Sequence, residues 1–77
     1  MITQQTNIYE SSTVESSTYD FKEKELYVSF KGNSVYLYQN VSPEIYESFR
    51  DADSQGKALN SLIKKNEDIT FEKLEDI

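Results

Sequence analysis

The chain has 77 residues, enough for one small domain, and its 14 acidic and 8 basic residues give a net charge of −6. It contains no cysteine and no histidine, which excludes disulfides and leaves neither the usual ligands of a zinc site nor the usual base of a catalytic nucleophile. The acidic balance argues against broad, non-specific binding of nucleic acid, because such binding depends on the neutralisation of phosphates.

The N-terminal segment, residues 1–12, is polar, and Ile8 and Tyr9 are its only large apolar pair. We expect it to be a frayed or edge segment. The start of the chain lacks the basic residues and apolar run of a signal peptide, and no stretch approaches the roughly 18 apolar residues of a membrane span. We therefore expect a cytoplasmic protein that does not contact a membrane.

Three segments then show the composition and alternation of β-strands. The first expected strand is residues 14–21, with Tyr19 and Phe21 on one face. In residues 25–31 apolar and more polar positions alternate, as in a half-buried strand. Residues 34–39 are almost continuously apolar or amphipathic, which suggests a central strand with cover on both sides.

The turn between the last two of these strands decides which side chains share a face. A two-residue turn over residues 32–33 places Phe30 opposite Val35 and leaves a face of exposed tyrosines, namely Tyr27, Tyr36 and Tyr38. A three-residue loop over residues 32–34 places Phe30 opposite Tyr36 and buries the tyrosines of the later strand. Because a slip of one residue inverts the faces of a strand, the first register suggests binding and the second packing. We expect the second.

A helix is predicted to begin after Ser42, which can cap it, with Pro43 at the first helical position. Its apolar face is formed by positions spaced four and three residues apart, with Tyr46 at the flank of that stripe: Ile45, Phe49 and Ala52.

A second helix is predicted to begin at Ser54 or Gly56 and to end near Asn66. Its apolar side consists of Leu59, Leu62 and Ile63. The remaining residues, 67–77, carry five acids and one lysine. This tail is compatible with a third short helix, an added strand over residues 69–71 or a disordered segment.

Several short motifs occur in a fixed order along the chain. They are Ser11-Ser12-x-Val14, Tyr19-Asp20, Leu26-x-Val28-x-Phe30, Tyr36-x-Tyr38-x-x-Val41, Ile45-Tyr46, Ala52-x-Ser54-x-Gly56-Lys57 and Asn60-x-x-Ile63. Together they resemble the KTSC family, a small domain found alone in bacterial and phage proteins and at the C-terminus of some lysyl-tRNA synthetases. The resemblance implies a short antiparallel sheet followed by helices. It also suggests RNA binding, by analogy with the synthetases alone.

We therefore predict an α+β fold in which a three-stranded antiparallel meander is followed by two packed helices. Residues 1–66 form the domain, and residues 67–77 form a short acidic C-terminal extension. A domain this small often gains core by association, so a homodimer through an exposed edge strand is compatible with the sequence.

For function we predict a small binding module and not an enzyme, with no catalytic residue, cofactor or metal. The first hypothesis is a protein partner, bound through an exposed face and the acidic tail, with the apolar anchors Phe71, Leu74 and Ile77. The alternative is RNA, bound by stacking on sheet tyrosines and by a local lysine patch. The residues of that second site are Tyr27, Tyr36, Tyr38, Lys57, Lys64 and Lys65.

Overall fold

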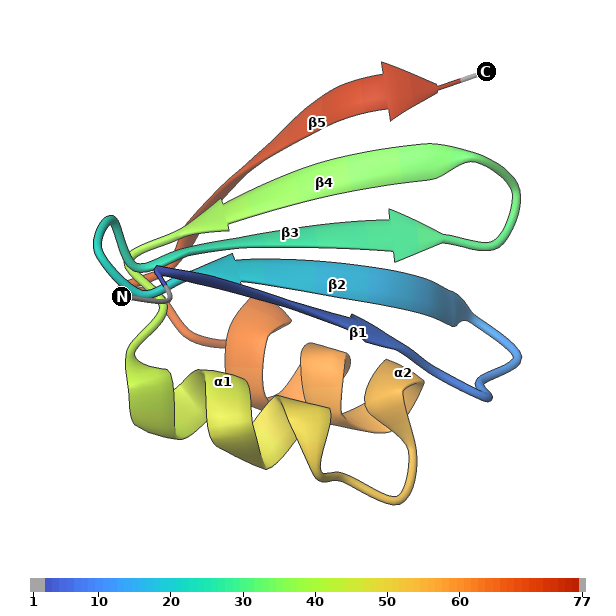
Figure 1. Ribbon diagram of the computed structural model, residues 1–77, viewed down its shortest axis with the longest axis horizontal. Coiled ribbons are helices and arrows are strands. Elements are labelled where there is room, and N and C mark those ends of the chain that lie inside the picture. Colours follow the sequence, from blue (N-terminus) through green and yellow to red (C-terminus); the bar gives the residue numbers. More distant parts are fainter. Residues whose placement is uncertain (1–2, 77) are drawn as a thin grey trace.

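The computed structural model describes the backbone of residues 3–76 and the side chains of residues 3–74. Five antiparallel strands form one sheet in chain order, with a helical layer on one face (Figure 1). The strands are β1 (Gln4–Ile8), β2 (Val14–Asp20), β3 (Glu25–Phe30), β4 (Ser34–Gln39) and β5 (Thr70–Asp76). The helices are α1 (Pro43–Arg50), α2 (Gln55–Ala58) and the π-helix η1 (Leu59–Lys64). None of the helices in this part of the chain is long and apolar enough to cross a membrane.

The α+β class and the helices after the meander are confirmed, but the prediction of three strands is wrong, because β1 and β5 add an edge strand on each side. β1 shows little apolar alternation because none of its side chains is buried, and Ile8 remains 85 % exposed. The acidic tail forms the added strand, which is longer than residues 69–71. Ile69, the residue before this strand, is 8 % exposed and belongs to the core, and the charged residues of the strand can stay in solvent at an edge.

The hairpin between β3 and β4 has neither of the two predicted registers. Phe30 lies opposite Ser34 and Val28 opposite Tyr36, so residues 31–33 form the loop. Two loop residues, Gly32 and Asn33, have positive φ angles of 101° and 70°. The expected pairing was therefore wrong by two residues. Since a shift of two preserves the faces of a strand, Tyr36 and Tyr38 do lie on the face of Val28 and Phe30, as expected. Tyr38 is buried there, whereas Tyr36 is only partly buried.

The helices begin where the sequence places them. The Ser42 hydroxyl accepts a hydrogen bond from the Ile45 amide at 3.2 Å, and the Ser54 hydroxyl accepts one from the Lys57 amide at 3.4 Å. The second helix then widens into η1, where the Lys65 amide donates to the carbonyl of Asn60, five residues earlier, at 3.2 Å.

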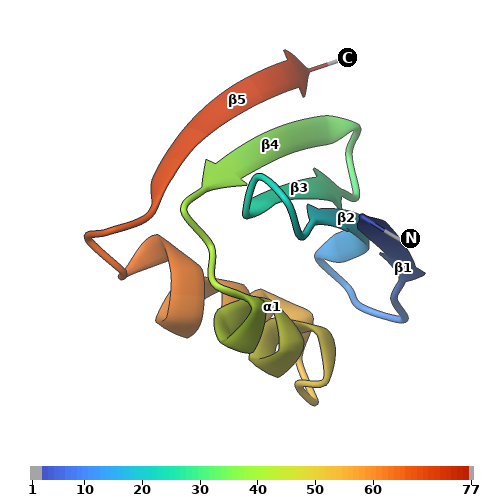
Figure 2. The same cartoon turned by 60° about the vertical axis from the view of Figure 1, so that its left-hand side comes forward.

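The core lies between the helices and the face of the sheet that carries Leu26 and Val28. Tyr46 of α1 was predicted at the flank of the apolar stripe, yet it is fully buried and stacks on Tyr19, with ring centroids 4.3 Å apart. Figure 2 shows α1 lying under the sheet and β5 curving away at the far side. The helical layer therefore covers the half of this face over β1 and β2 more completely than the half beside β4 and β5 (Figure 2).

Candidate functional site

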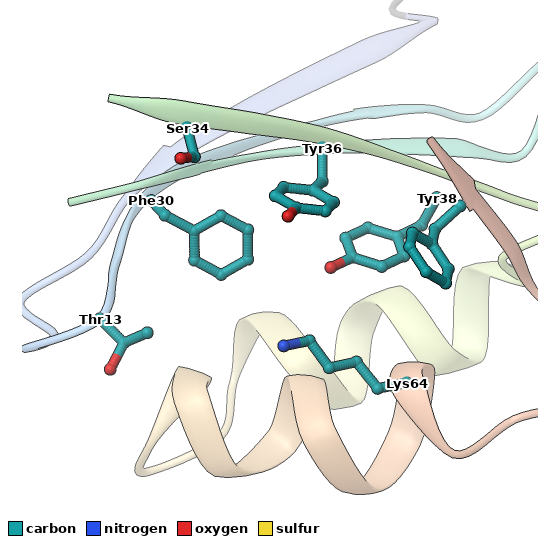
Figure 3. Close-up of a pocket in the computed structure, with 7 residues that line it drawn as sticks. Thr13, Phe30, Ser34, Tyr36, Tyr38 and Lys64 are labelled. Carbon is teal, nitrogen blue, oxygen red and sulfur yellow. The ribbon is translucent and has the colours of Figure 1, made fainter. Parts of the chain in front are cut away.

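A groove of about 480 Å³ opens between the helix-facing side of the sheet and η1 (Figure 3). We call it the aromatic groove, and its lining residues are Thr13, Phe30, Ser34, Tyr36, Tyr38, Lys64 and Phe71. They come from the loop before β2, from strands β3, β4 and β5, and from the last residue of η1. Its volume and mostly aromatic lining are typical of sites that bind a small group.

The aromatic wall follows from the register of three strands. Tyr36 and Tyr38 are alternate residues of β4, so their rings lie on one face, with centroids 6.3 Å apart. Phe30 stands edge-on to Tyr36 at 5.5 Å. On the other side, Phe71 lies opposite Tyr38 in the pairing of β4 with β5, and its ring is 6.2 Å from both tyrosine rings. The four rings form one continuous surface.

The two tyrosine hydroxyl groups point into this groove in Figure 3. Among the described residues, neither hydroxyl has a hydrogen-bond partner. Burial, together with the neighbouring Tyr36, raises the pKa of Tyr38 from 10.0 to about 12. The Tyr38 phenol is therefore neutral at physiological pH, and it can donate a hydrogen bond to a ligand in the groove.

Lys64 supplies the only charge among the lining residues, as far as the structure describes them. Its ammonium nitrogen lies 5.9 Å from the centroid of the Phe30 ring, within the range of a cation–π contact. In residues 3–74 no carboxylate pairs with it. The groove thus combines an apolar aromatic wall, hydroxyl donors and one cation in a protein whose net charge is −6.

The structure divides the residues predicted for RNA binding. Tyr36, Tyr38 and Lys64 meet in the aromatic groove. Tyr27 lies opposite Leu37, on the other face of the sheet. Lys57 in α2 and Lys65 after η1 are exposed and do not line the groove.

The residues predicted for protein binding are also divided. Phe71 lines the groove and is 68 % exposed, while Leu74 is 46 % exposed farther along β5. Ile77 lies outside the described residues. Phe30 was used only in the family motif and in the comparison of the two hairpin registers, and Thr13 and Ser34 were given no role in a site. The available signals were the alternation in residues 25–31 and the expected three-residue loop, which also placed Phe30 next to Tyr36.

The lining of the aromatic groove contains no carboxylate, and the described residues contain no group of three or more side chains suited to hold a metal ion. Two aspartates outside the groove are engaged by neighbouring residues. Asp51 pairs with Arg50 at 2.8 Å, and Asp20 accepts hydrogen bonds from the amides of Lys22 and Glu23. These bonds lower the pKa of both aspartates.

Similarity to known proteins covers most of the chain. The sequence matches the family described as KTSC domain over residues 10–66. A protein of Tsukamurella paurometabola is 38 % identical over 55 residues, which cover 71 % of this chain and 82 % of that protein. A protein of Stutzerimonas stutzeri strain A1501 is 34 % identical over 55 residues, covering 71 % of this chain and 78 % of that protein.

One solved structure has the same fold. A crystal structure of a KTSC domain protein from Yersinia pestis has a TM-score of 0.84 and 25 % identity, and the match covers 94 % of this chain and 99 % of that chain. The groove residues Phe30, Tyr36, Tyr38 and Lys64 fall inside the family match, whereas Phe71 follows it. The outer wall of the groove is thus contributed by β5, beyond the family region.

Proposed function

This chain belongs to the KTSC domain family, as its sequence resemblance predicted, and we propose that it is a non-enzymatic module that binds a protein partner through the aromatic groove and strand β5. The observation that carries the proposal is the exposure of Phe71. This side chain is 68 % exposed although it belongs to a wall of four aromatic rings, and Leu74 on the same strand is 46 % exposed. Aromatic side chains of this kind are enriched at protein interfaces.

The position of β5 supports a protein as the partner. It is the last strand of the sheet and pairs only with β4 within the described residues. An extended segment of another protein can add to such an edge through main-chain hydrogen bonds, while its side chains occupy adjacent pockets. The groove beside this edge provides a pocket of that kind.

The test compares partner capture by the wild-type chain with capture by a double variant, Phe71→Ser and Leu74→Ser. The matched control is Thr70→Ser, an exposed position at the start of the same strand. We expect the double variant to lose proteins that the wild type and the control both retain, and purified candidates then to bind in the same order. Equal recovery by all three chains would remove β5 and the groove as the binding surface.

RNA is the second candidate, and it is favoured by the convergence of Tyr36, Tyr38 and Lys64 on one groove. Bases stack on such rings, and the binding would weaken with salt according to the number of phosphate contacts. The test is an NMR titration of the labelled protein with a pool of short single-stranded RNAs at low salt. Shifts confined to the groove would support this candidate, and an unchanged spectrum would eliminate it.

A further inference from the structure

We propose that the aromatic groove recognises an acidic peptide segment in which an aromatic side chain lies next to a carboxylate. The aromatic side chain packs on the accessible rings of Tyr36 and Phe71, and the carboxylate binds the ammonium group of Lys64. This inference rests on the proposed function, because it specifies the chemistry of the protein partner.

The case for an anionic group starts from charge complementarity. Lys64 is the one charged side chain among the described residues that line the groove, and none of them gives it a carboxylate partner. Lys64 is exposed at the mouth of the groove and lies beside the Phe30 ring, so its ammonium group is accessible to an anion that enters the groove. The groove is a local positive site in a protein with a net charge of −6.

The hydroxyl groups point to the same ligand chemistry. Tyr36 and Tyr38 carry phenols without a hydrogen-bond partner in the described part of the chain. Phenols are good donors to carboxylate oxygens, and charge-assisted bonds of this type are short and strong. One carboxylate can therefore receive donors from the sheet side and from Lys64 on the helix side, which face each other across the groove (Figure 3).

The case for a peptide and against a nucleic acid comes from the edge strand and from the charges around it. A nucleic acid brings a chain of phosphates, yet the lining offers a single cation, and β5 carries the acids Glu72, Glu75 and Asp76. A peptide needs only one carboxylate at Lys64. Its backbone can run along β5, whose outer edge has no neighbouring strand among the described residues.

The test is a titration of the ¹⁵N-labelled full chain with a blocked hexapeptide that contains one phenylalanine followed by one glutamate, flanked by serines. Two matched peptides replace the glutamate by glutamine or the phenylalanine by alanine. We expect shifts at the amides of Phe30, Tyr36, Lys64 and Phe71 with the first peptide. Binding is expected to be about fivefold weaker with the glutamine peptide and to be lost with the alanine peptide.

Two protein variants compare Lys64, which lines the groove, with Lys65, which does not. Lys64→Gln should weaken binding of the glutamate peptide by about fivefold and should bind the glutamate and glutamine peptides equally. Lys65→Gln, which changes the net charge by the same amount outside the groove, should bind like the wild type. Equal effects of the two variants would overturn the role of Lys64.

Two further probes decide the source of the anion. Phenylacetate tests a free aromatic carboxylate, and adenosine monophosphate tests a nucleotide. Tighter binding of either probe than of the glutamate peptide would overturn the peptide as the natural ligand, as would an unchanged spectrum with the peptide at roughly 5 mM. If the peptide fails while partner capture still depends on Phe71 and Leu74, only the ligand chemistry is wrong and the proposed function stands.

Discussion

The helix-facing side of the sheet has a closed half and an open half, and both are built from tyrosine and phenylalanine. In the closed half, over β1 and β2, the two buried phenols of Tyr19 and Tyr46 and the partly buried phenol of Tyr9 each have a partner within the chain. Tyr19 donates to the carbonyl of Val41, Tyr46 donates to Gln5 at 2.6 Å, and Tyr9 bonds to Ser17 at 2.7 Å. In the open half, the described residues give the phenols of Tyr36 and Tyr38 no partner.

The difference depends on what lies across from each ring and not on the type of residue. In the closed half, Tyr46 of α1 stacks directly on Tyr19, and both rings are fully buried. The rings of the open half face η1 across a groove of about 480 Å³, and β5 extends beyond the helices. No buried side-chain polar atom of the described residues lacks a partner, so the phenol oxygens of Tyr36 and Tyr38 are reached by solvent at the groove, where a ligand can also bond to them. The predictions below test this contrast, from the largest expected effect to the smallest.

The largest effect is expected from Phe49→Ala in the closed half. Phe49 is fully buried in α1 and lies edge-on to Tyr9, with ring centroids 5.6 Å apart. Removal of the ring leaves a cavity and should lower the free energy of unfolding by about 3–5 kcal/mol, which is enough to unfold a domain of this size. Urea denaturation measures this free energy of unfolding, and Phe71→Ala in the open half is the control. A comparable loss at Phe71 would contradict the division into two halves.

A second effect is expected from alkaline pH. The folded chain raises the pKa of Tyr38 from 10.0 to about 12, so the folded state keeps this proton more tightly than the unfolded state. The stability that this provides is present below pH 10 and is lost as the pH rises from 10 to 12, by up to about 2–3 kcal/mol. Burial also raises the pKa values of Tyr19 and Tyr46, which adds to the loss in the same direction.

The variant Tyr38→Phe isolates the contribution of this one phenol. Because phenylalanine has no ionisable proton, the variant should lose less stability between pH 9 and pH 12 than the wild type. The measurement is the urea midpoint as a function of pH. Parallel curves for the two chains would show that the Tyr38 phenol titrates at its ordinary value.

The hydroxyl groups give the most direct comparison of the two halves. Tyr19→Phe removes the only donor shown for the Val41 carbonyl in its buried setting and should cost about 1–2 kcal/mol of unfolding free energy. Tyr36→Phe removes a hydroxyl without a partner in the described residues and should change stability by less than about 0.5 kcal/mol. Equal costs for both would mean that the Tyr36 hydroxyl also has a structural role.

Local signals in the sequence were sufficient for the helix starts. Ser42 and Ser54 cap helices through their own hydroxyl groups, which depend only on residues a few positions away. The sequence predicted that a hairpin exists and which side chains share a face of its strands, but it did not predict which residues form the loop. Turn chemistry identified Gly32 and Asn33 as residues that accept a positive φ, yet whether Lys31 belongs to the strand or to the loop depends on packing against the rest of the sheet.

The aromatic groove depends on contacts that are distant in the sequence. The acidic composition of residues 67–77 gave no clear strand signal. Their partner strand is β4, where Tyr38, about thirty residues earlier in the chain, lies opposite Phe71. Lys64 was grouped with Lys57 and Lys65 because the three are close in sequence, but only Lys64 faces the groove. A pattern of charges and apolar residues along one segment cannot determine which residues of four other segments surround it.

The smallest effect is expected from Lys64→Gln, and its comparison is Arg50→Gln in the closed half. Each cation lies near an aromatic ring, Lys64 at 5.9 Å from Phe30 and Arg50 at 5.6 Å from Tyr46. Arg50 also bonds to Asp51 at 2.8 Å and to Gln5 at 3.2 Å, so Arg50→Gln should lower the free energy of unfolding more than Lys64→Gln does. Lys64 has only the ring contact among the described residues, and its loss should change stability by less than about 0.5 kcal/mol. Urea denaturation of both variants measures the two losses of unfolding free energy. If Lys64→Gln proved the more costly, Lys64 would hold the groove together, and its role in binding an anion would lose its physical basis.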